Sequence, residues 1–155
     1  MSFEKVKHYF EQNNLAHRVL DLDQSSATVE QAAMAIGCEP AVIAKTMSFF
    51  INDKPILIVT AGDVKIDNKK YKDHFHEKAK MIPYDQVETY VGHAPGGVCP
   101  FCINEDVTVY LDKSLQRFDI VYPAGGSASS AVKLSLGELE SLSSAVGWVD
   151  VCKPS

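Results

Sequence analysis

The stretch TMSFFINDKPILIVT, residues 46–60, decides the fold. Its two runs at 46–51 and 55–60 are rich in β-branched and aromatic residues, and the polar link Asn52-Asp53-Lys54 lies between them. Two such runs joined by a short polar link are typical of a β-hairpin. We therefore expect a sheet built around this hairpin.

Helical patterns lie on both sides of the hairpin. Residues 3, 6 and 10 place apolar side chains on one helical face, and the boxes at Thr28–Gln31 and Ser135–Glu138 have capping-box spacing. The pattern predicts one helix that ends at Asn13-Asn14, a second that ends at Gly37 and one that runs from the second box through Leu142. Further helices are expected at 39–44, 67–78 and 83–91. Short strands are expected at 16–23, 107–111, 119–122 and 132–134.

Strands and helices mix here without a regular strand–helix–strand alternation, which favours an α+β class with helices packed around a sheet. At 155 residues, without repeats, low-complexity tracts or linkers, the chain is expected to be a single domain spanning 1–155. Its 46% hydrophobic and 23% charged residues exclude collagen-like and disordered chains.

Charge and segment composition exclude several classes of partner. The net charge of −5 argues against coating of duplex DNA or RNA, but leaves local contact with one RNA end open. No apolar run approaches the ~20 residues of a membrane span. The amphipathic start lacks a signal-peptide core, so we expect no membrane association, a cytoplasmic location, and free thiols at the four cysteines.

Lys45 is the only charged residue between Glu39 and Asp53. One interpretation is a lysine that extends from a helix end to water along its apolar stem. The other is a cleft lysine, held by apolar walls and directed at an anionic or carbonyl group.

Residues 89–104 contain no charged side chain and include His93-Ala94-Pro95-Gly96-Gly97-Val98-Cys99-Pro100. Such a glycine-rich loop can direct successive N–H groups at one oxygen, as an oxyanion hole requires. A plain surface turn is the alternative. A second uncharged segment, Gly125-Gly126-Ser127-Ala128-Ser129-Ser130, could line a pocket or hold a phosphate, although it matches neither the P-loop nor the dinucleotide fingerprint.

Cys99-Pro100-Phe101-Cys102 is a C-x-x-C pair. A redox site would place that pair at the start of a helix, and structural zinc needs four ligands, for which no second pair has suitable spacing. We therefore expect ordinary loop thiols, no metal and no cofactor. Lysines at 65, 69, 70, 72, 78 and 80 are either a solvated helix face or a contact surface for RNA phosphates.

Taken in order, these segments give the chain a family resemblance. It resembles the YbaK/EbsC family, the free-standing relatives of the editing domain inserted in bacterial prolyl-tRNA synthetase, over about 27–142. The likeness rests on Val42-Ile43-Ala44-Lys45-Thr46, on Gly96-Gly97-Val98-Cys99-Pro100, and on Ala124-Gly125-Gly126 followed by Val132-Lys133-Leu134. It implies an α+β fold with a mixed, curved sheet.

The resemblance also implies an activity, the hydrolysis in trans of mischarged aminoacyl-tRNA. The partners would be the aminoacyl-tRNA acceptor end and an aminoacyl-tRNA synthetase. Lys45 would hold the terminal nucleotide, and the amides of Gly96, Gly97, Val98 and Cys99 would stabilise the oxyanion. The free ribose hydroxyl of the tRNA would help to activate water, so no Ser-His-Asp arrangement is required. The remaining candidate substrate-binding residues are Val42, Thr46, Met47, His93, Pro100, Phe101, Gly125, Gly126 and Ser127.

Walls formed by Val42, Met47, Val98, Phe101 and the small residues at 127–130 would carry no charge near the amino-acid side chain. Because an unpaired buried charge is costly, small uncharged amino acids are the expected substrates. Two alternatives stay open: a non-catalytic module that binds aminoacyl-tRNA or an aminoacyl nucleotide, and a redox or metal protein built on Cys99 and Cys102.

Overall fold

The computed structural model describes residues 2–155 and contains the predicted hairpin. Strand β2 (Ile43–Ile51) pairs antiparallel with β3 (Lys54–Ala61), with Ile51 opposite Lys54. Asn52 and Asp53 form the turn with φ angles of 50° and 64°. Positive φ at both central residues belongs to the two-residue turn whose twist matches that of the strands. The hairpin is confirmed, and Lys54 lies in the strand rather than in the turn.

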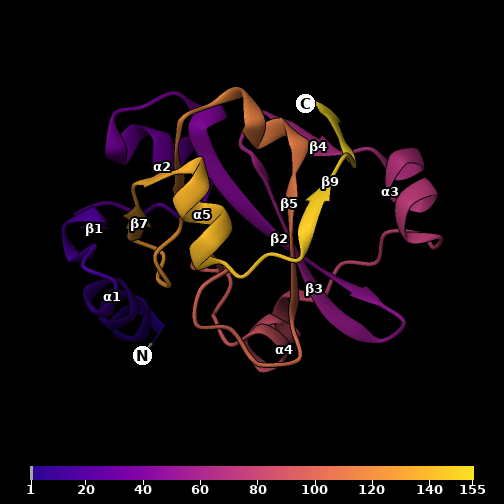
Figure 1. The fold of residues 1–155 in the computed structure, drawn as a ribbon, viewed down its shortest axis with the longest axis horizontal. Helices are drawn as coiled ribbons and strands as arrows, with labels where there is room; N and C mark the ends of the chain where they lie inside the picture. The colour runs from indigo at the N-terminus through magenta and orange to yellow at the C-terminus, as the bar shows by residue number, and fades with distance from the viewer. Residues whose placement is uncertain (1) are drawn as a thin grey trace.

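A curled six-stranded sheet forms around this hairpin (Figure 1), in the order β8-β6-β2-β3-β5-β9. The added strands are β5 (Thr108–Asp112), β6 (Ile120–Pro123), β8 (Leu134–Ser135) and β9 (Gly147–Val149). Parallel pairs (β2–β6, β3–β5, β5–β9) and antiparallel pairs (β2–β3, β6–β8) coexist. The predicted α+β class with a mixed sheet is confirmed.

Two small antiparallel pairs complete the strands. β1 (Val19–Asp21) pairs with β7 (Ser130–Val132), and β4 (Val64–Ile66) pairs with β10 (Cys152–Pro154). Figure 1 shows β1 and β7 at one end of the molecule beside α1, and β4 near the C-terminus.

The helices are α1 (Ser2–Gln12), α2 (Val29–Ile36), α3 (Asn68–Phe75), α4 (Val87–Val91) and α5 (Leu136–Leu142). The Thr28 side chain accepts a hydrogen bond from the Gln31 amide and Gly37 ends α2 in the left-handed region, as predicted. Ser135 and Glu138 form the full reciprocal capping box. Within the described part of the chain, no helix is long and apolar enough to cross a membrane.

Several expected boundaries are wrong. The predicted helix at 39–44 is a single 3₁₀ turn, Pro40–Val42, because Ile43 and Ala44 already pair with β6. The strand expected at 16–23 is a 3₁₀ turn at Ala16–Arg18 followed by β1. The helix at 67–78 ends early, because His76 adopts a φ of 63°, and the segment 83–91 begins as a 3₁₀ turn before α4.

Candidate functional site

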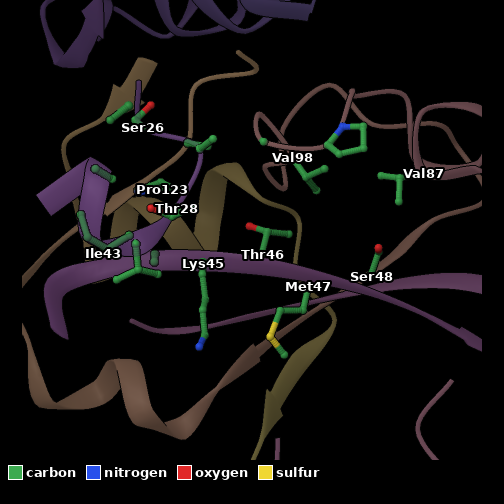
Figure 2. Close-up of a pocket in the computed structure, with 18 of the residues that line it drawn as sticks. Ser26, Thr28, Ile43, Lys45, Thr46, Met47, Ser48, Val87, Val98 and Pro123 are labelled. Atoms are coloured by element: carbon green, nitrogen blue, oxygen red, sulfur yellow. The ribbon is translucent and has the colours of Figure 1, made fainter. Parts of the chain in front are cut away.

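A cavity of about 660 Å³ lies at an open part of the β2 edge (Figure 2). β6 pairs with β2 only at Ile43 and Ala44. Further along, the Ile82 amide donates to the Ser48 carbonyl at 3.1 Å. Between these two contacts the 45–47 edge has no strand partner among residues 2–155. Other segments converge on this gap and enclose it.

Most of the lining residues are apolar or carry a small hydroxyl group, and Lys45 is the one charged side chain among those that the structure describes. The lining comprises Ser26, Ala27, Thr28, Val29, Ala32, Ile43, Ala44, Lys45, Thr46, Met47, Ser48, Met81, Ile82, Pro83, Tyr84, Val87, Pro95, Gly96, Val98, Tyr122, Pro123, Ala124, Ser130 and Ala131. A mostly apolar cavity of this size with few polar groups is typical of a small-molecule or cofactor site.

Thr46 supplies polar groups to the floor of the cavity. Its Oγ1 is buried without a hydrogen-bond partner in the described structure. Backbone groups alternate between the two edges of a strand, and those of Ser48 and Phe50 bond outward to 80–82. The amide and carbonyl of Thr46 therefore face the open edge as well. Buried polar groups are nearly always paired, so this cluster is suited to a polar ligand.

Lys45 leaves β2 on the side opposite to Thr46, as Figure 2 shows. Its Nζ donates a hydrogen bond to the Val64 carbonyl of β4. Burial lowers the pKa of Lys45, while Cys152, Glu30 and Asp63 oppose this effect. The residue lies on a strand and not at a helix end, so the interpretation of a lysine extending from a helix does not apply.

The predicted glycine-rich loop reaches the cavity through Pro95, Gly96 and Val98. The Gly97 amide donates to the Ala94 carbonyl at 3.1 Å and is thus already occupied. The amides of Gly96, Val98 and Cys99 have no backbone acceptor within residues 2–155. Gly96 and Val98 line the cavity, so their amides are available to a ligand oxygen, whereas Gly97 and Cys99 are buried and absent from the lining.

The second glycine-rich segment supports the first. A Cβ built on Gly97 would lie 2.7 Å from the Ser127 nitrogen, so the two backbones touch there. Gly126, with a φ of 94°, leaves no room for a Cβ against the Ser2 carbonyl oxygen, which would be 2.9 Å away. Gly125, Gly126 and Ser127 are not part of the cavity lining, and their position indicates a supporting role.

Four other predicted contacts lie outside the cavity. Phe101 is 1% exposed, and its ring lies 5.0 Å from that of Phe10, so the prediction that it forms a cavity wall is wrong. Pro100 lines a separate groove. His93 is fully buried and hydrogen-bonds to Phe101, and Val42 is absent from the lining. After Val98 the chain turns inward and the Phe101 ring packs against Phe10 of α1, which removes Phe101 from the cavity.

The cysteine pair has contrasting environments. Cys99 is buried, which raises its pKa to about 12, whereas Cys102 is exposed. A low-pKa thiolate is the reactive form of a redox cysteine, so Cys99 lacks this property. Within residues 2–155, no group of three or more His, Cys, Asp or Glu side chains is arranged to hold a metal.

Sequence patterns missed several walls of the cavity, namely Ser26, Met81, Tyr84, Val87 and Tyr122. Only the tertiary fold brings their segments to the β2 edge. In the structure Met81 and Tyr84 are large apolar side chains that are 59% and 79% exposed, a signal that the sequence alone does not contain.

Known proteins share this architecture. The chain is 27% identical to a protein of known structure described as a proposed trans-editing enzyme for prolyl tRNA synthetase, with a TM-score of 0.86 over 98% of this chain and 97% of the other. A hypothetical protein, APE2540, has a TM-score of 0.84 at 25% identity, over 96% of this chain and 99% of the other.

Sequence relatives point the same way. Uncharacterized protein YwhH of Bacillus subtilis is 49% identical over 99% of this chain and 98% of its own length. Proline–tRNA ligase of Limosilactobacillus fermentum is 30% identical over 57% of this chain, a match that covers 17% of the ligase. The sequence profile of the aminoacyl-tRNA editing domain matches residues 23–142. This chain therefore belongs to the aminoacyl-tRNA editing domain family, as its resemblance to YbaK-like proteins indicated.

Proposed function

We propose that this chain hydrolyses the ester bond of mischarged aminoacyl-tRNA in trans and prefers small, uncharged amino acids. The observation that carries the proposal is the cavity itself, whose lining combines the unpaired polar groups of Thr46 with the free amides of Gly96 and Val98. Lys45, the next residue of the same strand, is the one charged residue of the described lining, and its side chain leaves β2 on the opposite side. Such polar groups can hold the carbonyl of an ester that links an amino acid to a terminal ribose, and a positive charge can hold the nucleotide.

In the reaction, water adds to the ester carbonyl, the C–O bond to the ribose breaks, and the ribose oxygen takes up a proton. The amides of Gly96 and Val98 would stabilise the oxyanion of the tetrahedral intermediate; one such donor is worth ~2.7–4 kcal/mol in other enzymes. Lys45 would leave the Val64 carbonyl to meet the terminal nucleotide by its phosphate or ribose. The stem of lysine has four flexible carbons, which makes this movement feasible.

The lining contains no His, Asp or Glu that could serve as general base, among the residues described. Activation of water then falls to the substrate, and the free hydroxyl of the terminal ribose lies next to the ester. A substrate-assisted reaction of this kind fits a cavity without a nucleophile.

The uncharged walls support the substrate preference. A charged amino-acid side chain would lose its hydration in this cavity without gaining a partner other than Lys45. Pockets separate uncharged analogues by only ~1–3 kcal/mol per methylene, so esters of Ala, Ser, Cys and Thr should overlap as substrates.

The test is a panel of tRNAs charged with Ala, Ser, Cys, Thr, Asp, Lys and Phe, with ester loss followed over time. We expect turnover of one or more small esters well above the uncatalysed rate, with the charged and aromatic esters slower. No turnover of any small ester would contradict deacylation, and faster loss of a charged or aromatic ester would contradict the preference.

A second candidate is a non-catalytic module that binds the aminoacyl end. It is favoured by the missing general base and by the bond between Lys45 and Val64. Saturable binding of a non-hydrolysable aminoacyl-adenosine analogue without ester loss would select this candidate. The relatedness to an editing domain within a synthetase makes a synthetase the natural protein partner in both cases.

A further inference from the structure

His93 is fully buried at the base of the loop whose tip lines the cavity. Its Nε2 lies 2.6 Å from the carbonyl oxygen of Phe101, eight residues further along the chain. A carbonyl only accepts hydrogen bonds, so Nε2 carries the proton and donates it to Phe101. One side chain thus joins the two ends of the segment that contains the free amides of Gly96 and Val98.

Among the described residues, the bond to the Phe101 carbonyl is the only strong hydrogen bond that His93 makes. Its Nδ1 is buried and has no partner in the described residues. The Cys99 Sγ lies 3.5 Å from Nε2 and 3.8 Å from the Phe101 carbonyl, distances of weak contacts. Burying an unpaired ring nitrogen costs free energy, which an apolar residue at this position would avoid. Packing alone does not account for a histidine here.

Backbone bonds close the same loop one step further out. The Asn104 amide donates to the Val91 carbonyl at 2.9 Å, and the Asn104 side chain donates to the carbonyls of Thr89 and Tyr90. Two sets of hydrogen bonds therefore join the ends of the loop, and the outer set, made by Asn104, holds the end of α4. Inside the loop the Gly97 amide bonds to the Ala94 carbonyl, and among the described side chains it is His93 that joins the two ends of the 94–100 segment, through Phe101.

We infer that His93 is a positioning residue: its Nε2–H bond to the Phe101 carbonyl holds the 94–100 loop in the shape that aims its amides into the cavity. This inference rests on the proposed function. It replaces the expectation that His93 binds substrate, since a fully buried ring bonded to the main chain cannot do so.

The physical reason is the sensitivity of oxyanion stabilisation to geometry. Amide donors act when they lie 2.7–3.1 Å from the developing charge, and a displacement of ~1 Å at a reacting centre can cost ~10²-fold in rate. Burial also lowers the pKa of His93, so the ring stays neutral and its single proton remains committed to Phe101.

Three substitutions separate positioning from packing. His93→Leu fills the space but removes the donor. His93→Gln keeps an N–H donor near the position of Nε2, and His93→Asn carries an amide that is too short to reach Phe101. Val149→Ala, in β9 and outside the cavity, is the control for general loss of stability.

Two readouts are measured on the intact chain: kcat and KM for the best ester, and hydrogen exchange of the Gly97 amide, which donates to the Ala94 carbonyl inside the loop. We expect His93→Leu and His93→Asn to lose about 10-fold or more in kcat with KM changed less than about threefold, and to exchange this amide faster. His93→Gln should restore both quantities to near wild type, and Val149→Ala should alter neither.

The inference is overturned if His93→Leu keeps the wild-type kcat and exchange rates, if His93→Gln fails as completely as His93→Leu, or if Val149→Ala gives the same loss. The exchange readout is independent of turnover. If wild type hydrolyses no ester but exchange still depends on the donor at 93, the proposed function fails while the role of His93 in shaping the loop stands.

Discussion

The backbone of Gly97 lies directly against that of Ser127, so closely that a Cβ at 97 would approach the Ser127 nitrogen to 2.7 Å and its Cα to 2.8 Å. The loop that carries the candidate oxyanion amides is thus supported by main chain, which has little freedom to move away. A supported loop is what electrostatic stabilisation of a transition state requires, because its donors do not reorganise during the reaction.

Gly97→Ala should therefore displace the loop. Overpacking of this kind typically costs ~1–3 kcal/mol, and we expect that loss in urea denaturation together with a fall in ester hydrolysis. Gly137→Ala is the matched control, because a Cβ at 137 in α5 meets nothing within 4 Å. It should raise stability by up to ~1 kcal/mol, the helix preference of alanine over glycine, and leave hydrolysis unchanged. Equal behaviour of the two variants would show that the contact with Ser127 is unimportant.

Thr46→Val should leave stability unchanged or raise it while lowering activity, because it removes a buried hydroxyl that has no partner in the described structure. Thr60→Val provides the comparison on the paired strand. The Thr60 hydroxyl donates to the Ala61 carbonyl at 3.1 Å, so its loss should cost about 0.5–1.5 kcal/mol with no effect on hydrolysis. Urea denaturation and ester turnover of both variants check this. A large loss of stability in Thr46→Val alone would mean that its hydroxyl is a structural group.

Glu138 makes the free energy of unfolding depend on pH, and the direction of its pKa shift fixes the sign of that dependence. The Ser135 amide and Arg18 both donate to its carboxylate, at 2.8 and 2.7 Å, and lower the pKa of Glu138 below its ordinary 4.5. As pH falls, the unfolded chain takes up the proton first, so the contribution of this carboxylate is present above about pH 4.5 and disappears below the folded pKa.

Glu138→Gln should accordingly be less stable than wild type at pH 7, by less than ~1 kcal/mol because the pair is partly exposed. The difference should shrink in urea titrations as the pH is lowered below about 4.5. A gap that persists unchanged in acid would assign the effect to packing and not to charge.

Local signals in the sequence were sufficient for the helix starts and the central hairpin. Thr28 and Ser135 cap their own helices within three residues, and the Asn52-Asp53 turn needs no distant partner. These elements depend on neighbouring residues only, so the sequence pattern contains the information.

Elements that depend on distant pairing could not be predicted. β9 and β10 are three residues each and exist because they pair with β5 and β4, far away in the chain. The same reason explains the error at Phe101. Because it belongs to an uncharged loop, it was predicted to line the cavity, but its ring packs against Phe10 in the core. Whether a residue lines the cavity depends on the tertiary fold. Among the predicted site residues, those that line the cavity are Lys45, Thr46, Met47, Gly96 and Val98.

Thiol labelling checks the placement of the C-x-x-C pair. In native protein at neutral pH, Cys102 is exposed and should react first with a thiol reagent. Cys99 and Cys152 are buried with pKa values raised to about 12, so both should react only after unfolding in urea. Mass spectrometry of the labelled peptides identifies the sites. Rapid labelling of Cys99 would show that the loop opens and that its amides are not held in place.

We propose that the cavity at the β2 edge hydrolyses its ester with the help of one cation, Lys45. The direct measurement is single-turnover hydrolysis of the best small aminoacyl-tRNA by wild type and by Lys45→Ala, with urea denaturation to show that both are folded. We expect Lys45→Ala to be folded and at least about 10-fold slower, equivalent to about 1.4 kcal/mol of transition-state stabilisation. A folded Lys45→Ala variant that hydrolyses the ester at the wild-type rate would show that Lys45 has no part in the reaction.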